Sequence, residues 1–386
     1  MKRNQILSIT YLFYFVAGAC CLLIGSSLTQ LTAYYDLPLS KVVLLGSLFA
    51  LGRVISVNPI ARILEKYGAK RMVQAGALAF LLFVIGIPLF HSYSVQMVLS
   101  FIGGIGLAAQ DTCGPVLFSA VDRNNYATHM SMGQALFGVG NFFTPFLISL
   151  MLKTGQPFYY AFYLMALIPL FILFASKKMK LNRQKEEEEE QVTPLYVKNT
   201  VLSAILIALI MVSYSSIFNC LCTYTTSLAE ARGFSAADAS ILLTVFNVGG
   251  VAGSFLFAAL LKKIPEIRIL ILNLSVSFGL LFLIRTIPFS FVSYPLFGLL
   301  GIFVAVLFGI IFTVSTRIGY RRITMAASLT SMLSGLSDIA TPLITGRIIE
   351  HFEIGGVFRY VQILTGICLL GAVGLLLQIT NRKGQE

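Results

Sequence analysis

Long apolar segments, separated by short charged or turn-rich stretches, follow one another along almost the whole chain. A helix needs about 20 predominantly apolar residues to cross the hydrocarbon core of a bilayer. With 57% apolar and 11% charged residues, against about 25% charged in soluble proteins, the composition excludes a soluble enzyme, a nucleic-acid-binding domain and a disordered chain. We predict an all-α membrane protein with 12 transmembrane helices, which span residues 7–33, 41–64, 72–91, 95–121, 127–152, 157–176, 199–228, 236–261, 267–287, 290–316, 324–349 and 356–380.

The placement of Lys and Arg predicts the orientation, because basic loops are retained on the cytoplasmic side of a membrane. With both termini in the cytoplasm, 21 basic residues lie on the cytoplasmic side and 6 on the outer side. The remaining one, Arg53, lies inside a predicted helix. We therefore expect a multi-pass protein of the cell membrane (plasma or inner membrane) with both termini cytoplasmic. The net charge of +12 then reflects topology and not a nucleic-acid partner.

One long hydrophilic stretch, 177–198, divides the predicted helices six and six. We expect an N-terminal six-helix bundle over 1–176, a cytoplasmic charged linker over 177–198, and a C-terminal six-helix bundle over 199–386. The linker contains the run Glu186–Glu190, which repels itself and stays solvated. A flexible connection is the simpler interpretation of this run, and a regulatory role is the alternative.

The two halves of the sequence match when the chain is shifted by 197 residues. Residues 49–52 in helix two fall on residues 246–249 in helix eight, both reading Phe-x-x-Gly. At the same offset, Gly138, Asn141, Thr144 and Pro145 in helix five fall on Gly335, Asp338, Thr341 and Pro342 in helix eleven. Parallel six-helix repeats of this kind are typical of transporters whose halves rock around a binding site near the bilayer midplane.

The loop between helices two and three reads Ile-Leu-Glu-Lys-Tyr-Gly-Ala-Lys-Arg over residues 63–71. It resembles a degenerate form of the major facilitator superfamily loop G-x-x-x-D-(R/K)-x-G-(R/K)-(R/K). The resemblance implies the major facilitator fold, two pseudo-symmetric six-helix bundles, and a cytoplasmic gate whose acid engages the neighbouring half. A basic topology determinant is the plainer interpretation, and both can hold. The matching positions of this gating loop are Glu65, Lys66, Gly68, Lys70 and Arg71.

Three ionisable residues, Arg53, Asp111 and Asp338, lie near the middle of predicted helices, where charges are costly and mark function by default. At the helical rise per residue, Arg53 and Asp338 lie about 18 Å and about 17 Å from the outer ends of helices two and eleven. The resemblance places these two helices side by side, so we consider a salt bridge that forms in one access state and breaks in the other. Pairing of Arg53 with Asp111, or binding of an anionic substrate by Arg53, are the alternatives.

Asp111 follows a glycine-rich stretch (103–106) and Gln110 in helix four. Small residues let neighbouring backbones approach closely, so we expect the glycine face to pack while Gln110 and Asp111 face a polar environment. Desolvation favours the protonated form of a carboxylate. We therefore predict Asp111, together with Asp338, as the proton-coupling groups; a hydrogen-bonded packing role for Asp111 is the alternative.

Polar residues form matching stripes on one face of helix five (Gln134, Asn141, Thr144) and of helix eleven (Ser331, Asp338, Thr341). Such stripes predict the walls of a shared substrate cavity, although polar stripes also hold helices together. The family resemblance adds helices one and seven, which line the cavity in that family. The candidate cavity residues are Gln30, Arg53, Gln110, Gln134, Asn141, Tyr214, Asn219 and Asp338.

Asp111-Thr112-Cys-Gly-Pro in helix four and Gly133-Gln134-Ala135 in helix five are similar to the fucose–galactose–glucose:proton symporter branch of the superfamily. The resemblance implies that Asp111 is the proton-linked carboxylate and that Gln134 contacts a sugar. The chain departs from this branch in helix one, where Gly25 replaces a second acid, and it contains no Trp for sugar stacking. A proton-driven exporter of drugs or metabolites and an organic-anion exchanger are the competing transport functions.

A membrane-embedded enzyme or a receptor is the alternative from a different class. The three histidines, His91, His129 and His351, fall near helix ends and form no metalloprotease pattern. The Cys residues lie inside apolar runs, where Cys behaves as a small hydrophobe. We expect no catalytic residues, no metal and no cofactor. The expected partners are a small-molecule substrate, protons and the lipid bilayer, and we expect the chain to work as a monomer.

Overall fold

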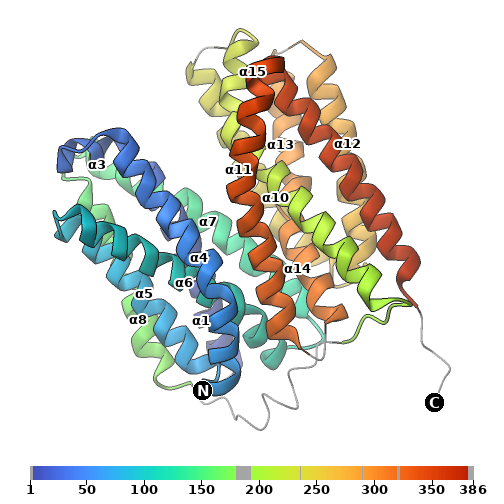
Figure 1. Cartoon of the computed structure of the whole chain (residues 1–386), viewed down its shortest axis with the longest axis horizontal. Helices are drawn as coiled ribbons and strands as arrows, with labels where there is room; N and C mark the ends of the chain where they lie inside the picture. The colour runs from blue at the N-terminus through green and yellow to red at the C-terminus, as the bar shows by residue number, and fades with distance from the viewer. Residues whose placement is uncertain (1–2, 180–192, 235, 289, 320–321, 381–386) are drawn as a thin grey trace. The chain divides into compact units, whose positions relative to one another are not determined.

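The computed structural model describes residues 3–179, 193–234, 236–288, 290–319 and 322–380, which form long helices joined by short turns (Figure 1). The predicted acidic run Glu186–Glu190 lies outside the described residues. The helices are α1 (Arg3–Cys21), α2 (Leu23–Ser26), α3 (Leu28–Tyr35), α4 (Leu39–Tyr67), α5 (Ala69–Leu89), α6 (Tyr93–Val121), α7 (Tyr126–Lys153), α8 (Tyr159–Ser176), α10 (Thr200–Ala231), α11 (Ala236–Leu260), α12 (Glu266–Thr286), α13 (Ser293–Val304), α14 (Leu307–Ile318) and α15 (Ile323–Gln378).

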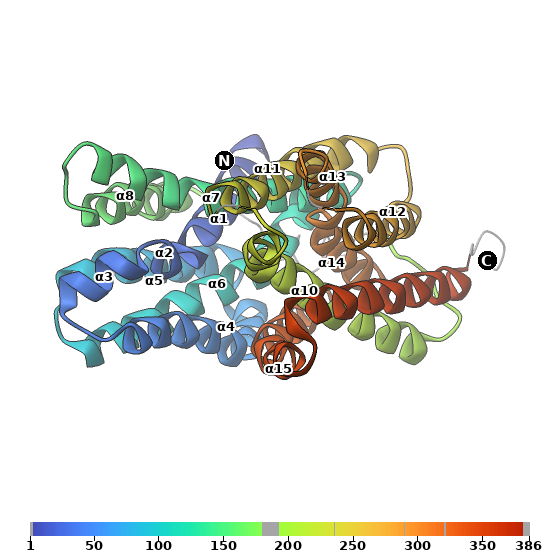
Figure 2. The ribbon, with the colours of Figure 1, turned by 90° about the horizontal axis from the view of Figure 1, so that it is seen from above.

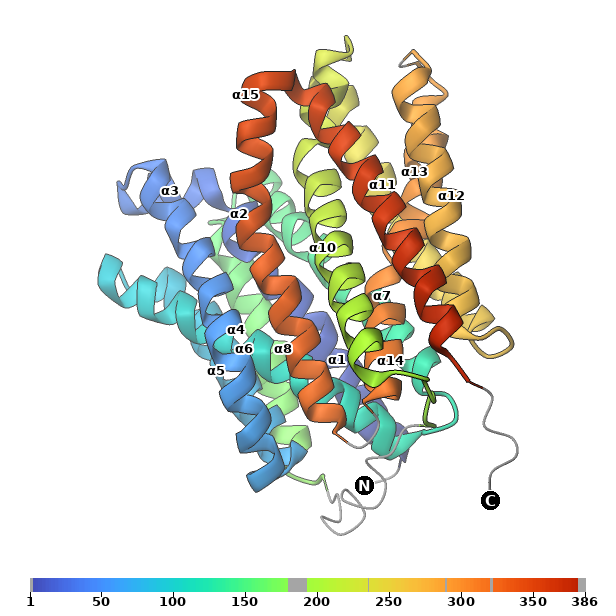
Figure 3. The ribbon, with the colours of Figure 1, turned by 45° about the vertical axis from the view of Figure 1, so that its right-hand side comes forward.

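Each of the twelve predicted helices is found in the structure, although three of the boundaries between elements differ. Helix one is divided into α1, α2 and α3, and helix ten into α13 and α14. Helices eleven and twelve run together as α15 and are separated by a single non-helical residue, Glu353 (φ 57°), at the sharp bend visible in Figure 3. Eleven described segments are long and apolar enough to cross a membrane, and α15 contributes only one of them despite its break. The predicted fold class is confirmed.

The chain divides into two compact units. Unit 1 comprises residues 1–124, 136–192 and 321–335, and unit 2 comprises 125–135, 193–320 and 336–386. The first turns of α7 therefore belong to unit 2, and the first turns of α15 to unit 1. These two exchanged segments are related by the 197-residue repeat. In unit 1, α6 packs against α1, α4 and α5, and α5 packs against α8 (Figure 2).

Glycines bring helices into backbone contact at equivalent places in both units. A Cβ at Gly104 of α6 would lie 2.0 Å from the carbonyl oxygen of Phe49 in α4. The equivalent Cβ at Gly301 of α13 would lie 1.9 Å from the carbonyl oxygen of Phe246 in α11. Small residues permit this approach in membrane helices. The predicted glycine packing face of helix four is thereby confirmed, and the repeat extends to helices four and ten.

A second matched seam joins α1 to α7 in unit 1 and α10 to α15 in unit 2. Gly140 of α7 lies so close to α1 that a Cβ would be 2.1 Å from the Phe15 carbonyl oxygen. At the equivalent position in unit 2, Ser337 Oγ donates to the Val212 carbonyl at 2.9 Å. One turn further, Thr144 Oγ1 donates to the Ala19 carbonyl at 2.8 Å. At this equivalent position the contact is therefore made by a glycine in unit 1 and by a serine hydroxyl in unit 2.

Candidate functional site

Arg53, Asp111 and Ser331 meet in a polar cluster of unit 1, which we call the carboxylate centre. Arg53 Nε on α4 donates to Asp111 Oδ2 on α6 at 2.8 Å, and Ser331 Oγ at the start of α15 donates to the same oxygen at 2.5 Å. The Arg53 side chain is 14% exposed and that of Asp111 7%. Hydrogen bonds to an ionised group are about twice as strong as neutral ones, so both donors hold the carboxylate firmly.

The glycine seam of α4 and α6 sets the position of this centre. Gly52 immediately precedes Arg53, and a Cβ at Gly104 would lie 2.7 Å from the Arg53 backbone nitrogen. Asp111 comes seven residues after Gly104, which places both on one face of α6. The two helices touch at Gly52 and Gly104. Asp111 lies two turns further along α6 on the same face, within reach of the long Arg53 side chain.

The start of α15 is attached to α4 by further contacts beside the carboxylate centre. Asn58 Nδ2 donates to Met332 Sδ at 3.1 Å. A Cβ at Gly335 would lie 2.4 Å from Val54 Cγ2, so the two helices touch at this turn as well. These contacts explain why 321–335 belongs to unit 1, although the rest of α15 belongs to unit 2.

Of the three predicted roles of Arg53, the structure contains the pairing with Asp111. Asp338 belongs to unit 2, where it interacts electrostatically with Tyr214 and Cys222 of α10. A salt bridge between Arg53 and Asp338 stays a prediction. The contact between Ser331 and Asp111 was not foreseen, although the polar stripe of helix eleven did include Ser331 and so contained the signal.

The other predicted cavity residues lie on four helices. Gln110 is buried on α6, next to Asp111. Gln134 belongs to unit 2, where a Cβ at Gly309 of α14 would lie 3.1 Å from its Cγ. Tyr214 is buried on α10 with its ring centroid 6.2 Å from that of Phe218, and Asn219 is half-buried further along α10. Gln110 belongs to unit 1 and the other three to unit 2, and their joint role in substrate binding stays a prediction.

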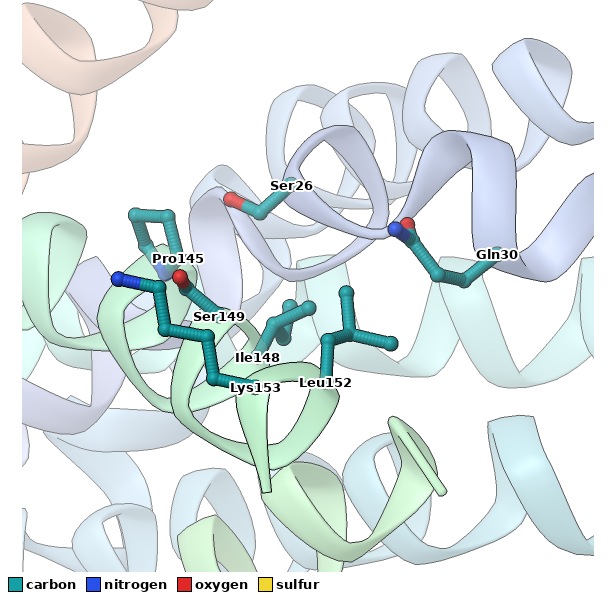
Figure 4. Close-up of a pocket in the computed structure, with 7 residues that line it drawn as sticks. All are labelled: Ser26, Gln30, Pro145, Ile148, Ser149, Leu152 and Lys153. Atoms are coloured by element: carbon teal, nitrogen blue, oxygen red, sulfur yellow. The ribbon is translucent and has the colours of Figure 1, made fainter. Parts of the chain in front are cut away.

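An open pocket of about 450 Å³ lies between helix one and α7 in unit 1 (Figure 4). The predicted residue Gln30 is part of its wall. Asn141, also predicted, lies one turn before the pocket on the same helix, and its buried Oδ1 accepts no hydrogen bond from the described residues. The lining residues are Ser26, Gln30, Pro145, Ile148, Ser149, Leu152 and Lys153.

The predicted gating loop forms the tight connection between α4 and α5. Gly68 ends α4 with a positive φ of 81°, a conformation that glycine adopts without strain. Lys66 and Arg71 flank the Tyr67 ring, with cation-to-centroid distances of 5.3 and 5.7 Å. Lys70 Nζ donates to the Lys177 carbonyl at 2.8 Å. Glu65 is exposed, and its gating role stays a prediction.

In unit 2, the last residues of the predicted linker (193–198) are attached at several points. Leu195 N–H donates to the Arg317 carbonyl at 3.0 Å, and Arg317 Nε donates to the Thr193 carbonyl at 2.8 Å. Arg317 Nη1 also contacts Glu266 Oε1 at 2.5 Å. Val197 forms a β-bridge with Ile379 at the end of α15. Across the described residues, no group of three His, Cys, Asp or Glu side chains has the geometry to hold a metal.

Curated proteins similar to this chain are bacterial membrane transport proteins. The uncharacterized MFS-type transporter YfkL of Bacillus subtilis (strain 168) is 23% identical over 357 residues, which cover 91% of this chain and 90% of YfkL. The inner membrane transport protein YdiN of Escherichia coli (strain K12) is 27% identical over 262 residues, covering 66% of this chain and 61% of YdiN.

Solved structures show the same fold at low identity. A variant of the E. coli fucose:proton symporter FucP has a TM-score of 0.79 and 13% identity, with 97% of this chain and 99% of FucP covered. The proton:xylose symporter XylE has a TM-score of 0.74 and 13% identity, with 95% and 94% covered. The sequence profile of the Major Facilitator Superfamily matches residues 7–342, most of the chain. The chain therefore belongs to the Major Facilitator Superfamily, whose members are membrane transporters and not enzymes.

Proposed function

We propose that this transporter moves a small hydroxylated solute, such as a sugar, together with a proton by alternating access. The observation that carries the proposal is the position of Asp111. Its carboxylate contacts Arg53 from the first half of the sequence and Ser331 from the second half. Proton uptake at Asp111 therefore acts on a contact that joins the two halves, which is what coupling of a proton to a conformational change requires.

Protonation of Asp111 removes the negative charge that attracts Arg53 and accepts the Ser331 hydrogen. The hydrogen bonds then lose their charge-assisted strength, about half of the total. The contacts that do not depend on this charge include the bond between Asn58 and Met332 and the packing against Val54. In the proposed cycle this loosening lets the start of α15 leave α4.

A sugar is the favoured substrate class because two proteins of the same fold, FucP and XylE, are symporters of fucose and xylose. The chain has no Trp, so aromatic stacking against a sugar ring falls to Tyr and Phe. Tyr214 lies with Phe218 and Phe308 in an aromatic group of unit 2, with ring centroids 6.2 and 6.4 Å from that of Tyr214. We propose this group, with Gln134, as the stacking and hydrogen-bonding surface for the solute.

The proposed orientation follows from the distribution of Lys and Arg. Both termini and the loop 63–71 face the cytoplasm in this orientation, and the end of α7 at Lys153 faces outward. We also propose that a single chain is the transporting unit, because the repeat already supplies the two halves that alternating access needs.

Transport in proteoliposomes tests the proposal through Asp111→Asn. This variant keeps the shape of the side chain but cannot carry the proton. We expect it to lose sugar accumulation driven by an inward proton gradient, while counterflow exchange of the same sugar without a gradient is retained. A panel of radiolabelled hexoses and pentoses supplies the substrate.

Asp36→Asn is the matched control. Asp36 ends α3 outside the carboxylate centre and has a left-handed backbone conformation, φ 52°, which Asn also tolerates. We expect this control to accumulate sugar as the unmodified protein does. Full gradient-driven accumulation by Asp111→Asn would contradict the proposed role of Asp111, and the absence of counterflow for every sugar in the unmodified protein would contradict the substrate class.

A further inference from the structure

The pocket in unit 1, here called the helix-one pocket, exists because helix one is interrupted. Up to Ala19, α1 stays in contact with α7 through Gly140 and Thr144. Beyond it, the chain leaves helical geometry at Leu22 and again at Ser27. Ser27 Oγ donates to the Leu23 carbonyl at 2.6 Å, so a side chain satisfies an acceptor near the second break. Helix one separates from α7 here, and the pocket opens between them.

The pocket wall combines one cation with neutral polar groups and an apolar surface. Among the described residues that line the pocket, Lys153 is the one charged side chain and none is a carboxylate. Figure 4 shows Ser149 and Lys153 on α7, with Ser26 and Gln30 across the pocket on the interrupted part of helix one. A volume of about 450 Å³ lies within the range of small-molecule sites, about 300–1,000 Å³.

The end of α7 is capped without the Lys153 side chain. The Thr154 N–H donates to the Leu150 carbonyl at 3.1 Å, and Thr154 Oγ1 donates to the Met151 carbonyl at 3.0 Å. The Gly155 N–H donates to the Leu152 carbonyl at 3.2 Å. A lysine in the last turn of a helix often serves these carbonyls, but here they have other donors. The last carbonyls of α7 therefore have donors other than the Lys153 ammonium group.

The residues that α7 contributes to the pocket wall lie on one face of that helix, and this face extends beyond the pocket. Pro145, Ile148, Ser149 and Leu152 recur at the spacing of one helical face, and Asn141 lies one turn before Pro145 on that face. The buried Oδ1 of Asn141 accepts no hydrogen bond from the described residues. A hydroxylated solute moving along this face would supply the missing donor.

From these observations we propose that the helix-one pocket binds the carboxylate of a small hydroxylated organic acid, such as a sugar acid. The carboxylate is held by Lys153 and Ser149, and the hydroxyl groups by Ser26 and Gln30. This inference rests on the proposed function in one respect, since the bound acid is taken to be the transported solute or a relative of it. Binding itself does not depend on transport and is measured separately.

Ligand-dependent thermal unfolding of the purified full-length protein in detergent tests the inference, with glucuronate as the probe and glucose as its neutral counterpart. A ligand that binds the native state raises the unfolding midpoint by mass action. We expect glucuronate to stabilise the protein more than glucose at equal concentration. In Lys153→Gln we expect at least a tenfold weaker apparent affinity for glucuronate and an unchanged response to glucose.

Lys41→Gln is the matched control because it removes the same charge at the start of α4, beside the Tyr93 ring and away from the pocket. Ser149→Leu fills the pocket without changing charge, and we expect it to weaken glucuronate binding as well. Equal glucuronate affinity in Lys153→Gln and Lys41→Gln, or no stabilisation of the unmodified protein by glucuronate, would overturn the inference. Loss of gradient-driven transport in Asp111→Asn leaves these binding measurements unaffected, so the two proposals fail separately.

Discussion

Units 1 and 2 have matched backbone seams but different chemistry at equivalent positions. The glycine contacts between α4 and α6 recur between α11 and α13 at an offset of 197 residues. At that offset Arg53 corresponds to Gly250, and Asp111 to Phe308, whose ring centroid is 5.7 Å from that of Phe312. The duplicated scaffold thus carries a buried ion pair in unit 1 and aromatic packing in unit 2. Helix packing alone does not require the ion pair, which supports a role for it in transport.

The exchanged segments differ in the same way. Ser331, in the segment of α15 that belongs to unit 1, donates to Asp111. Its repeat equivalent Gln134, in the segment of α7 that belongs to unit 2, lies against Gly309. The contacts of that segment include hydrogen bonds between Tyr126 and Thr316 at 2.9 Å and from Ser131 to the Ser254 carbonyl at 3.1 Å. The bond from Ser331 ends on an ionisable carboxylate, whereas these two hydrogen bonds join neutral groups.

The largest effect that separates the units is expected from the ion pair. Arg53→Gln leaves Asp111 buried without its guanidinium, which costs about 3–5 kcal/mol of unfolding free energy. The double variant Arg53→Gln/Asp111→Asn should cost much less than the sum of its single changes. Phe308→Leu, the volume-conserving change at the equivalent position of unit 2, should cost less than about 1.5 kcal/mol. Denaturation of the purified protein in mixed micelles measures all four, and additive single effects would refute the coupling.

We expect alanine substitutions in the glycine seams of the two units to lower stability by similar amounts. Gly104→Ala and Gly301→Ala each bring a Cβ within 2.0 Å or less of a backbone oxygen, so the helices must move apart, at a cost of about 3 kcal/mol. Gly279→Ala is the control, since nothing lies within 4 Å of its Cβ. Midpoints of thermal unfolding compare the three variants. Tolerance of alanine at one seam alone would show that the two units are not packed equivalently.

A smaller difference is expected between the exchanged segments. Ser331→Ala removes a hydrogen bond to a charged carboxylate and should cost about 2 kcal/mol. Gln134→Ala, at the repeat-equivalent position, should cost less because no ionised group is among the contacts that the structure gives for Gln134. The unfolding midpoints of both variants, measured under one set of conditions, test whether Ser331→Ala costs more stability than Gln134→Ala. Equal losses would mean that the charge at Asp111 adds nothing to the contact.

The smallest effect concerns the seam between α10 and α15. Ser337→Ala removes the bonds to the Val212 carbonyl and to Ser216, which keeps its bond from Thr341, and should cost about 1 kcal/mol. The reverse exchange in unit 1, Gly140→Ser, should cost more, because its Cβ would lie 2.1 Å from the Phe15 carbonyl oxygen. Thermal unfolding measures both. A tolerated Gly140→Ser would show that α1 and α7 can separate to the spacing of the serine seam.

The sequence predicted the helices well because bilayer thickness fixes their length and apolar content. Breaks within helices were not predictable in this way. Pro59, Pro115 and Pro145 lie inside continuous helices, whereas helix one is interrupted at Leu22 and Ser27, around the Gly25-Ser26 pair and without a proline. The hydropathy of an apolar segment is the same whether its helix is continuous or broken. A break is tolerated where other groups form hydrogen bonds with the backbone N–H and C=O groups that it frees.

Prediction of the site was limited by tertiary contacts. The cost of charge in a membrane identified Arg53 and Asp111 directly, and their pairing was one of three predicted alternatives. Ser331 could be recognised as polar and as a repeat partner of Gln134, but its contact with Asp111 depends on which unit the start of α15 joins. The helix-one pocket, apart from Gln30, depends on the break in helix one and so escaped prediction.

The exchange of segments between the halves has a consequence for the integrity of the molecule. Residues 125–135 of the first half are part of unit 2, and residues 321–335 of the second half are part of unit 1. Neither half of the polypeptide therefore contains a complete unit. A protease cut between residues 177 and 193 would break the covalent connection between the two halves. Each fragment would still contribute one of these segments to the other unit. We therefore expect the two fragments of the cleaved protein to stay associated.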